Sequence, residues 1–125
     1  MNMLRRLVIL FSGLIGAAGV AAAAAGTHMN PDPNVTTAAY FLMLGAAGAT
    51  AAAGLGAARG FRWSLADLGG AVIALGAALF GGTLIARALW QTTIFPMAAP
   101  TGGTMLILGW LMVGLAAFER ASRPA

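Results

Sequence analysis

The chain has 125 residues, of which 60% are hydrophobic and 8% are charged, and its formal net charge is +4. A soluble domain carries roughly 25% charged residues, and a small soluble fold cannot bury so much apolar surface, so the composition excludes an ordinary soluble domain. The absence of cysteine excludes disulfides and thiolate metal sites. The basic residues are all arginines scattered between apolar runs, which is typical of membrane edges and not of a nucleic-acid surface.

Four apolar runs without interior charge follow one another along the chain. Each is about 19 to 24 residues long, which at a rise of 1.5 Å per residue is enough to cross a hydrocarbon core of about 30 Å. No run shows the period of two expected of membrane strands, so we predict helices. The expected fold is all-α, a four-transmembrane-helix bundle forming one integral membrane domain over residues 1–125, with helices over about residues 4–25, 36–58, 65–89 and 98–119.

The first run, residues 7–25, has features of both a membrane helix and a secretory signal peptide. Arg5 and Arg6 precede it, and the small residues Ala23 to Ala25 offer a cleavage site. Its apolar part of about 19 residues exceeds the 7 to 15 typical of a signal, which favours a retained helix. Cleavage stays open as an alternative, because it would leave the other three helices in the same orientation.

The connection after the first run holds two prolines that a helix cannot pass through, and also the single histidine, His28. Asp32 lies beside it in sequence, and Arg87, at the end of the third run, is expected at the same depth. One interpretation gives an interface histidine and an Arg87 that reaches the headgroups, with Trp90 as an anchor. The alternative is a cluster of His28, Asp32 and Arg87 that lines an outer mouth and titrates near neutral pH.

Small residues predict where the helices touch, because helices in lipid associate through close packing at small side chains. The third run carries such residues at every fourth position, whereas similar stripes in the first two runs agree equally well with an alanine-rich composition. Pro100 falls in the first turns of the fourth helix, where proline is tolerated. The predicted packing residues are Gly70, Ala74, Ala78, Gly81, Gly82, Gly102, Gly103, Gly109 and Trp110.

Polar groups within the runs are few. Thr83 and Thr104 are expected at similar depth near the outer face, within reach of Tyr40. We interpret this level as a packing layer, and a small polar cavity open to the outside is the alternative. Trp110 lies near the middle of the fourth run, where its indole N–H needs an acceptor such as Thr50, so we predict that it packs inside the bundle. A Trp110 that faces the lipid or a partner is the alternative. The possible outer polar cluster comprises His28, Asp32, Tyr40, Thr83, Arg87 and Thr104.

The arginines predict the orientation. In a four-helix path, six of the seven lie on one side, and only Arg87 lies on the other. The positive-inside rule makes that side cytoplasmic, so we expect both termini there. Two acidic residues, Asp67 and Glu119, are expected on the same side of the membrane. Asp67 follows Ser64 by three positions, which predicts a capping box, and Glu119 is spaced to form a surface pair with Arg123.

Three segments resemble motifs of the YgdD-like proteins, also called domain-of-unknown-function family 423. They are "AAAGTH" (residues 23–28), "ALFGGTL" (residues 78–84), and "APTGG" followed after five residues by "GW" (residues 99–110). The resemblance implies a four-helix bacterial inner-membrane protein without an established activity, and a retained first helix. The chain departs from the family at Phe41 and Leu44, where Gln and His are frequent, and at Gly81 and Thr83, which replace serines.

The sequence contains no nucleophile–base pair, paired carboxylates, phosphate loop or metal-ligand cluster. We therefore predict no catalytic, cofactor-binding or metal-binding residues, no cofactor and no enzymatic activity. The expected role is that of a structural protein or an accessory subunit of a membrane assembly in the bacterial inner membrane. Its partners would be the lipid bilayer and either further copies of the chain or other membrane subunits, without nucleic acid. The alternative is a small transporter or channel, although coupled transporters usually need an intramembrane carboxylate.

Overall fold

A computed structural model describes residues 2–60 and 63–120 of the chain, and the regular structure of these residues is entirely helical. The helices are α1 (Met3–His28), α2 (Pro33–Ala58), α3 (Leu65–Trp90) and α4 (Ala98–Leu115), and α4 continues into a short 3₁₀ helix, η1 (Ala116–Phe118). Each of the four long helices, α4 taken together with η1, is long and apolar enough to cross a membrane. The predicted all-α fold with four such helices is confirmed.

The helix ends differ from the predicted ones at both sides of the first connection. Helix α1 continues through His28, and the N–H of Met29 still bonds to the carbonyl of Ala25 at 2.8 Å. Helix α2 begins at Pro33 because proline fits the first helical position, where no N–H is needed. The carboxylate of Asp32 caps this start by accepting from the N–H of Asn34 at 2.9 Å.

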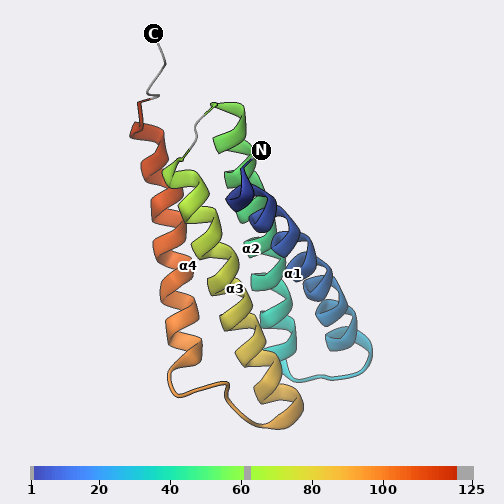
Figure 1. The fold of residues 1–125 in the computed structure, drawn as a ribbon. Helices are drawn as coiled ribbons and strands as arrows, with labels where there is room; N and C mark the ends of the chain where they lie inside the picture. The colour runs from blue at the N-terminus through green and yellow to red at the C-terminus, as the bar shows by residue number, and fades with distance from the viewer. Residues whose placement is uncertain (1, 61–62, 121–125) are drawn as a thin grey trace.

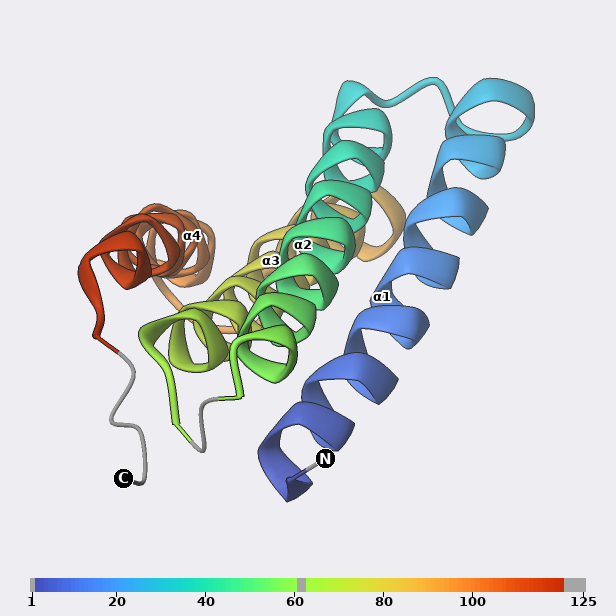
Figure 2. The ribbon, with the colours of Figure 1, turned by 90° about the horizontal axis from the view of Figure 1, so that it is seen from above.

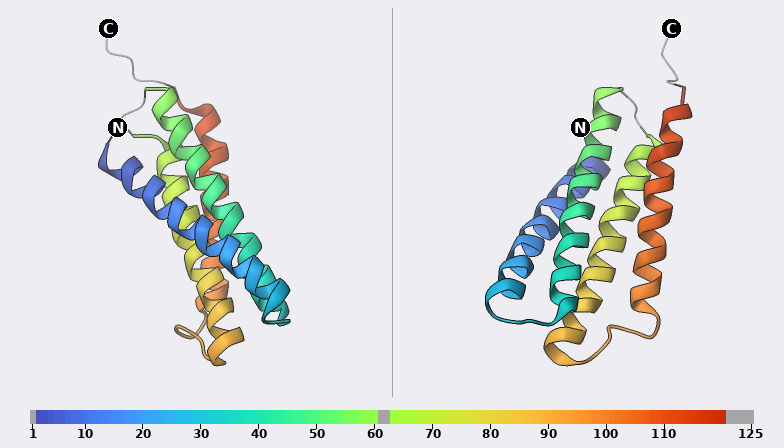
Figure 3. Two further views of the ribbon diagram at one scale, coloured as in Figure 1. Left: turned by 90° about the vertical axis from the view of Figure 1, so that its right-hand side faces the viewer. Right: turned by 180° about the vertical axis from the view of Figure 1, so that it is seen from behind.

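Consecutive helices lie side by side, and the bundle is open rather than closed (Figure 1). The views from above and from the side show α2 and α3 at the centre, with α1 on one flank and α4 on the other (Figures 2 and 3). The beginnings of α1 and α3 and the ends of α2 and η1 share one end of the molecule (Figure 1). We call it the arginine-rich end, because it carries Arg5, Arg6, Arg59 and Arg120; Arg62 and Arg123 lie outside the described residues.

Glycines bring α3 and α4 into backbone contact. A Cβ atom on Gly102 would lie 2.6 Å from the backbone nitrogen of Phe80, and one on Gly109 would lie 2.9 Å from the carbonyl oxygen of Gly69. On the α3 side, a Cβ atom on Gly76 would lie 2.9 Å from the carbonyl oxygen of Gly102. Gly69 and Gly76 are seven residues apart, as are Gly102 and Gly109, so the two glycine pairs face each other over about two turns.

The opposite face of α3 packs on α2 through other small residues. A Cβ atom on Gly70 would lie 3.2 Å from the carbonyl oxygen of Ala49, and Ala74 is 2% exposed. Ile73 lies between these two faces and is fully buried. Further along α3, Ala78 is half-buried, and the nearest atom to a Cβ on Gly82 is a side-chain carbon of Ile94 at 3.8 Å. The close contact of α3 with α2 nevertheless continues at Gly81, where a Cβ atom would lie 2.7 Å from a side-chain carbon of Leu42.

Candidate functional site

A buried ion pair joins α1 to α3 at the arginine-rich end. Arg5 Nε donates to Asp67 Oδ1 and Arg5 Nη2 donates to Asp67 Oδ2, each at 2.9 Å. The two side chains are only 7% and 1% exposed. Such a two-point contact fixes the orientation of both groups and satisfies charges that would otherwise be costly to bury.

Local structure places both members of this pair. Asn2 caps α1 by accepting from the N–H of Arg5 at 2.9 Å, and Asp67 lies in the first turn of α3, at the positive end of the helix dipole. Ser64 is the N-cap of α3, but its hydroxyl accepts from the N–H of Ala66 at 3.0 Å and not from that of Asp67, so the predicted capping box does not form. The Asp67 carboxylate turns to Arg5 instead of completing the box.

A second polar group ties the end of η1 to the start of α3. Glu119 accepts from the Ser64 hydroxyl at 2.7 Å and from the N–H of Leu65 at 3.0 Å. The Arg59 guanidinium donates to the carbonyl oxygens of Ala116 and Glu119 at 2.9 and 3.0 Å. The predicted partner of Glu119, Arg123, lies outside the described residues. Glu119 thus supplies the helix with a second capping group from a distant part of the chain.

The hydroxyls of the predicted outer layer bond within their own helices. Thr83 is fully buried and donates to the carbonyl of Leu79 at 2.7 Å, whereas Thr104 is exposed and donates to that of Pro100 at 2.8 Å. Tyr40 is 58% exposed on the surface of α2. Because each threonine already has an acceptor one turn earlier, neither depends on a bond to the neighbouring helix.

The other members of the predicted outer cluster are His28, Asp32 and Arg87. They lie at the end of the molecule that is opposite the arginine-rich end. His28 is the last residue of α1 and is exposed, and Asp32 is occupied as the cap of α2. Arg87 is exposed in the last turn of α3, where a cation is favourable. Among the residues described, these three form no ion pair with one another.

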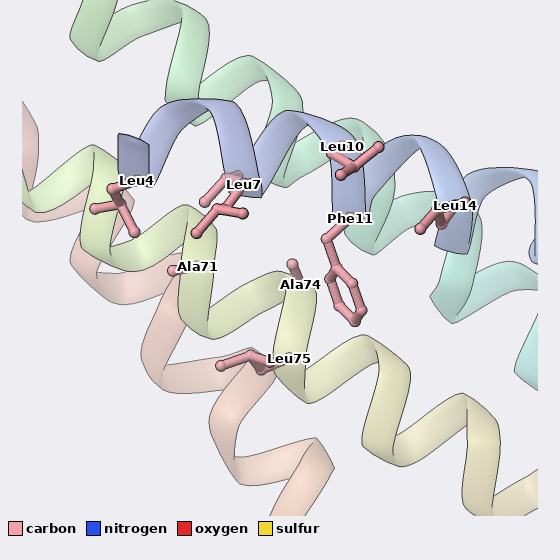
Figure 4. A pocket seen from close by; sticks show the side chains of 9 residues that line it. Leu4, Leu7, Leu10, Phe11, Leu14, Ala71, Ala74 and Leu75 are labelled. Carbon is pink, nitrogen blue, oxygen red and sulfur yellow. The ribbon is translucent and has the colours of Figure 1, made fainter. Parts of the chain in front are cut away.

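Two apolar grooves lie on the surface of the bundle. The α1/α3 groove has a volume of about 370 Å³ and runs along the first turns of α1; its lining includes Leu4, Leu7, Leu10, Leu14, Ala71 and Leu75. Figure 4 shows Leu4, Leu7 and Phe11 reaching from α1 across the groove toward α3. The α2/α4 groove is larger, about 750 Å³; its lining includes Phe41, Leu44, Phe80, Leu106, Trp110 and Leu111.

Trp110 occupies the wall of the α2/α4 groove. It is 48% exposed, and one edge of its ring rests on α2, where a Cβ atom on Gly48 would lie 2.6 Å from two ring carbons. The rings of Phe41 and Phe80 meet edge to face beside it, with centroids 4.9 Å apart. Thr50, considered above as the acceptor, is itself exposed on α2, and within the described parts of the chain the indole N–H forms no hydrogen bond.

Comparison of the chain with protein-family models, with curated proteins and with solved structures gives no match. The site therefore has to be interpreted from its own geometry. Sequence reasoning missed the Arg5–Asp67 pair because it assigned each residue a role near its own helix. The available signal was that α1 and α3 begin at the same end, each with a charge of opposite sign in its first turn.

Proposed function

We propose that the chain is a non-enzymatic, multi-pass protein of the bacterial inner membrane and acts as a structural or accessory subunit of a membrane assembly. Four helices of suitable length and hydropathy support the membrane location. The clustering of arginines at one end supports a cytoplasmic position for that end and for both termini. The resemblance to YgdD-like proteins agrees with this proposal.

The observation that carries the proposal is the position of Trp110. It lies two residues from the middle of the apolar span Ala98–Phe118, is half-exposed, and has an indole N–H without an acceptor in the described structure. Hydrocarbon offers no acceptor at that depth, and an unpaired donor there is costly. Ester and phosphate groups of ordinary lipids lie at the interfaces, too far away to serve.

A transmembrane helix of another subunit meets this need. The α2/α4 groove is apolar along its length, and the edge-to-face rings of Phe41 and Phe80 give it an ordered base. A helix seated there brings a serine, threonine or backbone carbonyl oxygen within reach of Trp110, while its apolar side chains pack on the groove. The partner helix comes either from a second copy of the chain or from a different membrane protein.

The alternative of a small transporter or channel has less support from the described residues. Both grooves are lined by apolar side chains, and the hydroxyls of Thr83 and Thr104 are already bonded within their helices. The described acidic residues lie at the ends of the helices and are all bonded, Asp67 and Glu119 at the arginine-rich end and Asp32 as the cap of α2.

The test is to isolate the chain from its native membrane in mild detergent and to identify stable companions by native mass spectrometry. Trp110→Phe keeps an aromatic ring but removes the N–H, and it should reduce the bound fraction about three- to tenfold, the range for an interhelical hydrogen bond in membranes. Trp90→Phe, at the exposed end of α3, is the matched control and should have no effect. A monomer without companions, or equal binding by Trp110→Phe, would contradict the proposal.

A further inference from the structure

The α1/α3 groove has the dimensions of one leaflet of a bilayer. Its α1 wall extends from Leu4 to Leu14, ten residues or about 15 Å along the helix axis, which is half of a hydrocarbon core of about 30 Å. The groove begins at Leu4, near the start of the span Met3–His28, and finishes at Leu14, near the middle of that span. It therefore faces one leaflet only, the one whose headgroups lie beside the start of α1.

The charged residues near the start of the groove, at the arginine-rich end, differ in whether they have a partner. Arg5 is buried and neutralised by Asp67, and the carboxylate of Glu119 is engaged by Ser64 and Leu65. Arg6 is exposed and has no ion pair among the residues that the structure describes. Arg6 precedes Leu10 by four positions, so the two side chains lie on neighbouring parts of one helix face, and Leu10 lines the groove. The guanidinium of Arg6 therefore lies beside the apolar α1/α3 groove.

We propose that the α1/α3 groove binds one acyl chain of an anionic phospholipid whose phosphate is held by Arg6. Every residue of the groove wall is leucine, valine, phenylalanine or alanine, so the occupant needs an apolar chain without polar groups along it. At the mouth it needs an anion to pair with Arg6. A phospholipid has both: its anionic phosphate lies at the membrane surface, and its acyl chain extends from there into the hydrocarbon core. Basic residues at cytoplasmic membrane edges favour anionic lipids.

A partner helix is a poorer match to this groove. The volume of about 370 Å³ is half that of the α2/α4 groove, and its wall presents no unpaired polar group that calls for a helix backbone or a hydroxyl. The small residues Ala71 and Ala74 deepen the groove on the α3 side, as shown in Figure 4. A slender, flexible chain fills such a space with little ordering of the protein.

The test uses the full chain in mild detergent with an equimolar mixture of phosphatidylglycerol and phosphatidylcholine of identical acyl chains, read by native mass spectrometry. We expect one retained lipid per chain, with phosphatidylglycerol favoured about fivefold, the size expected for one arginine at an anionic surface. Arg6→Gln should abolish this preference. Arg120→Gln, which removes an exposed cation at the same end of the molecule but outside the groove, should preserve it.

A second pair of variants tests the groove itself. Ala71→Phe places a ring in the groove and should remove the retained lipid of either kind. Leu10→Ala with Leu14→Ala should do the same by removing two exposed wall side chains (63% and 61% exposed) without disturbing the buried core, so the test does not depend on the folding of Ala71→Phe. Equal retention of the two lipids by the unaltered chain, an unchanged preference in Arg6→Gln, or undiminished retention in the groove variants would overturn the proposal.

Discussion

Arg5 and Asp67 stand 62 positions apart in sequence and are joined by two hydrogen bonds of 2.9 Å in the structure. The pair binds the first turn of α1 to the first turn of α3. Since α1 otherwise lies against α2 on the flank of the bundle, this pair fixes how α1 crosses the remaining helices (Figure 3). The structure therefore uses buried charge, together with small residues, to hold its helices.

Removing one member of the pair should destabilise the protein strongly. Asp67→Asn removes the charge that faces the buried Arg5 guanidinium in this pair, and we expect a loss of about 3 to 5 kcal/mol in the free energy of unfolding in detergent. Arg6→Gln, on the exposed neighbour, should change stability by less than about 0.5 kcal/mol. The double variant Arg5→Met with Asp67→Leu should recover most of the loss, because apolar residues of similar volume can replace a buried pair. Denaturant titration followed by circular dichroism measures all three; equal stability of Asp67→Asn and the unaltered protein would contradict the assignment.

Gly56 should prove necessary for the same pair. A Cβ atom at this position would lie 2.7 Å from Asp67 Oδ1 and 3.0 Å from Arg5 Nη2. Gly56→Ala therefore pushes the ion pair apart, and we expect a loss of about 1 to 3 kcal/mol. Gly54→Ala is the matched control on the same helix, because a Cβ there meets nothing within 4 Å and alanine is the better helix former. Thermal unfolding of the two variants side by side should show a lower Tm for Gly56→Ala only.

The α3–α4 contact should depend on Gly102 and not on its neighbour. A Cβ on Gly102 would lie 2.6 Å from the backbone nitrogen of Phe80, which cannot move aside, whereas one on Gly103 would lie 3.9 Å from the edge of the Phe80 ring. Gly102→Ala should cost about 1 to 3 kcal/mol, and Gly103→Ala should be neutral or slightly stabilising. Similar unfolding midpoints for the two variants would show that the helices are not in backbone contact here.

The carboxylate of Glu119 should protect the first turn of α3. It accepts from the N–H of Leu65, so Glu119→Ala leaves this donor to the solvent and weakens the helix start by about 0.5 to 2 kcal/mol, the usual range for a lost cap. Hydrogen exchange of the Leu65 amide should accelerate about two- to thirtyfold. Arg120→Ala changes the adjacent exposed residue and should leave this exchange rate as it is.

The proposed orientation can be tested with single cysteines, because the chain has none of its own. Cysteines in place of Asn2 and Arg120 should react only with reagents that reach the cytoplasm. Cysteines in place of Met29 and Thr92, in the exposed connections at the opposite end, should react with impermeant reagents from outside. The Asn2 variant also reports whether the first helix is retained. Labelling of residues 2 and 120 from opposite sides would refute the proposed topology.

The sequence predicted some of the residues at which the helices come into close contact, but not all of them. Gly70, Ala74, Gly102 and Gly109 were predicted as contact residues and lie in close contacts, whereas Gly69 was not predicted. A small-residue stripe indicates that a helix face can be approached, but several stripes overlap on one glycine-rich helix. Which of them is used depends on the crossing angle of the neighbour, and this angle is a property of the whole bundle.

The sequence by itself determined the four apolar helices, because length and hydropathy act along each segment separately and lipid allows few alternatives. It also predicted that most of the arginines lie at one end, and the structure places Arg5, Arg6, Arg59 and Arg120 there. Only the tertiary structure decided that Arg5 turns inward to Asp67, that Glu119 caps α3, and that the bundle leaves two grooves on its surface. These features join residues from different helices, and their energies depend on distances and burial that exist only after the helices have packed.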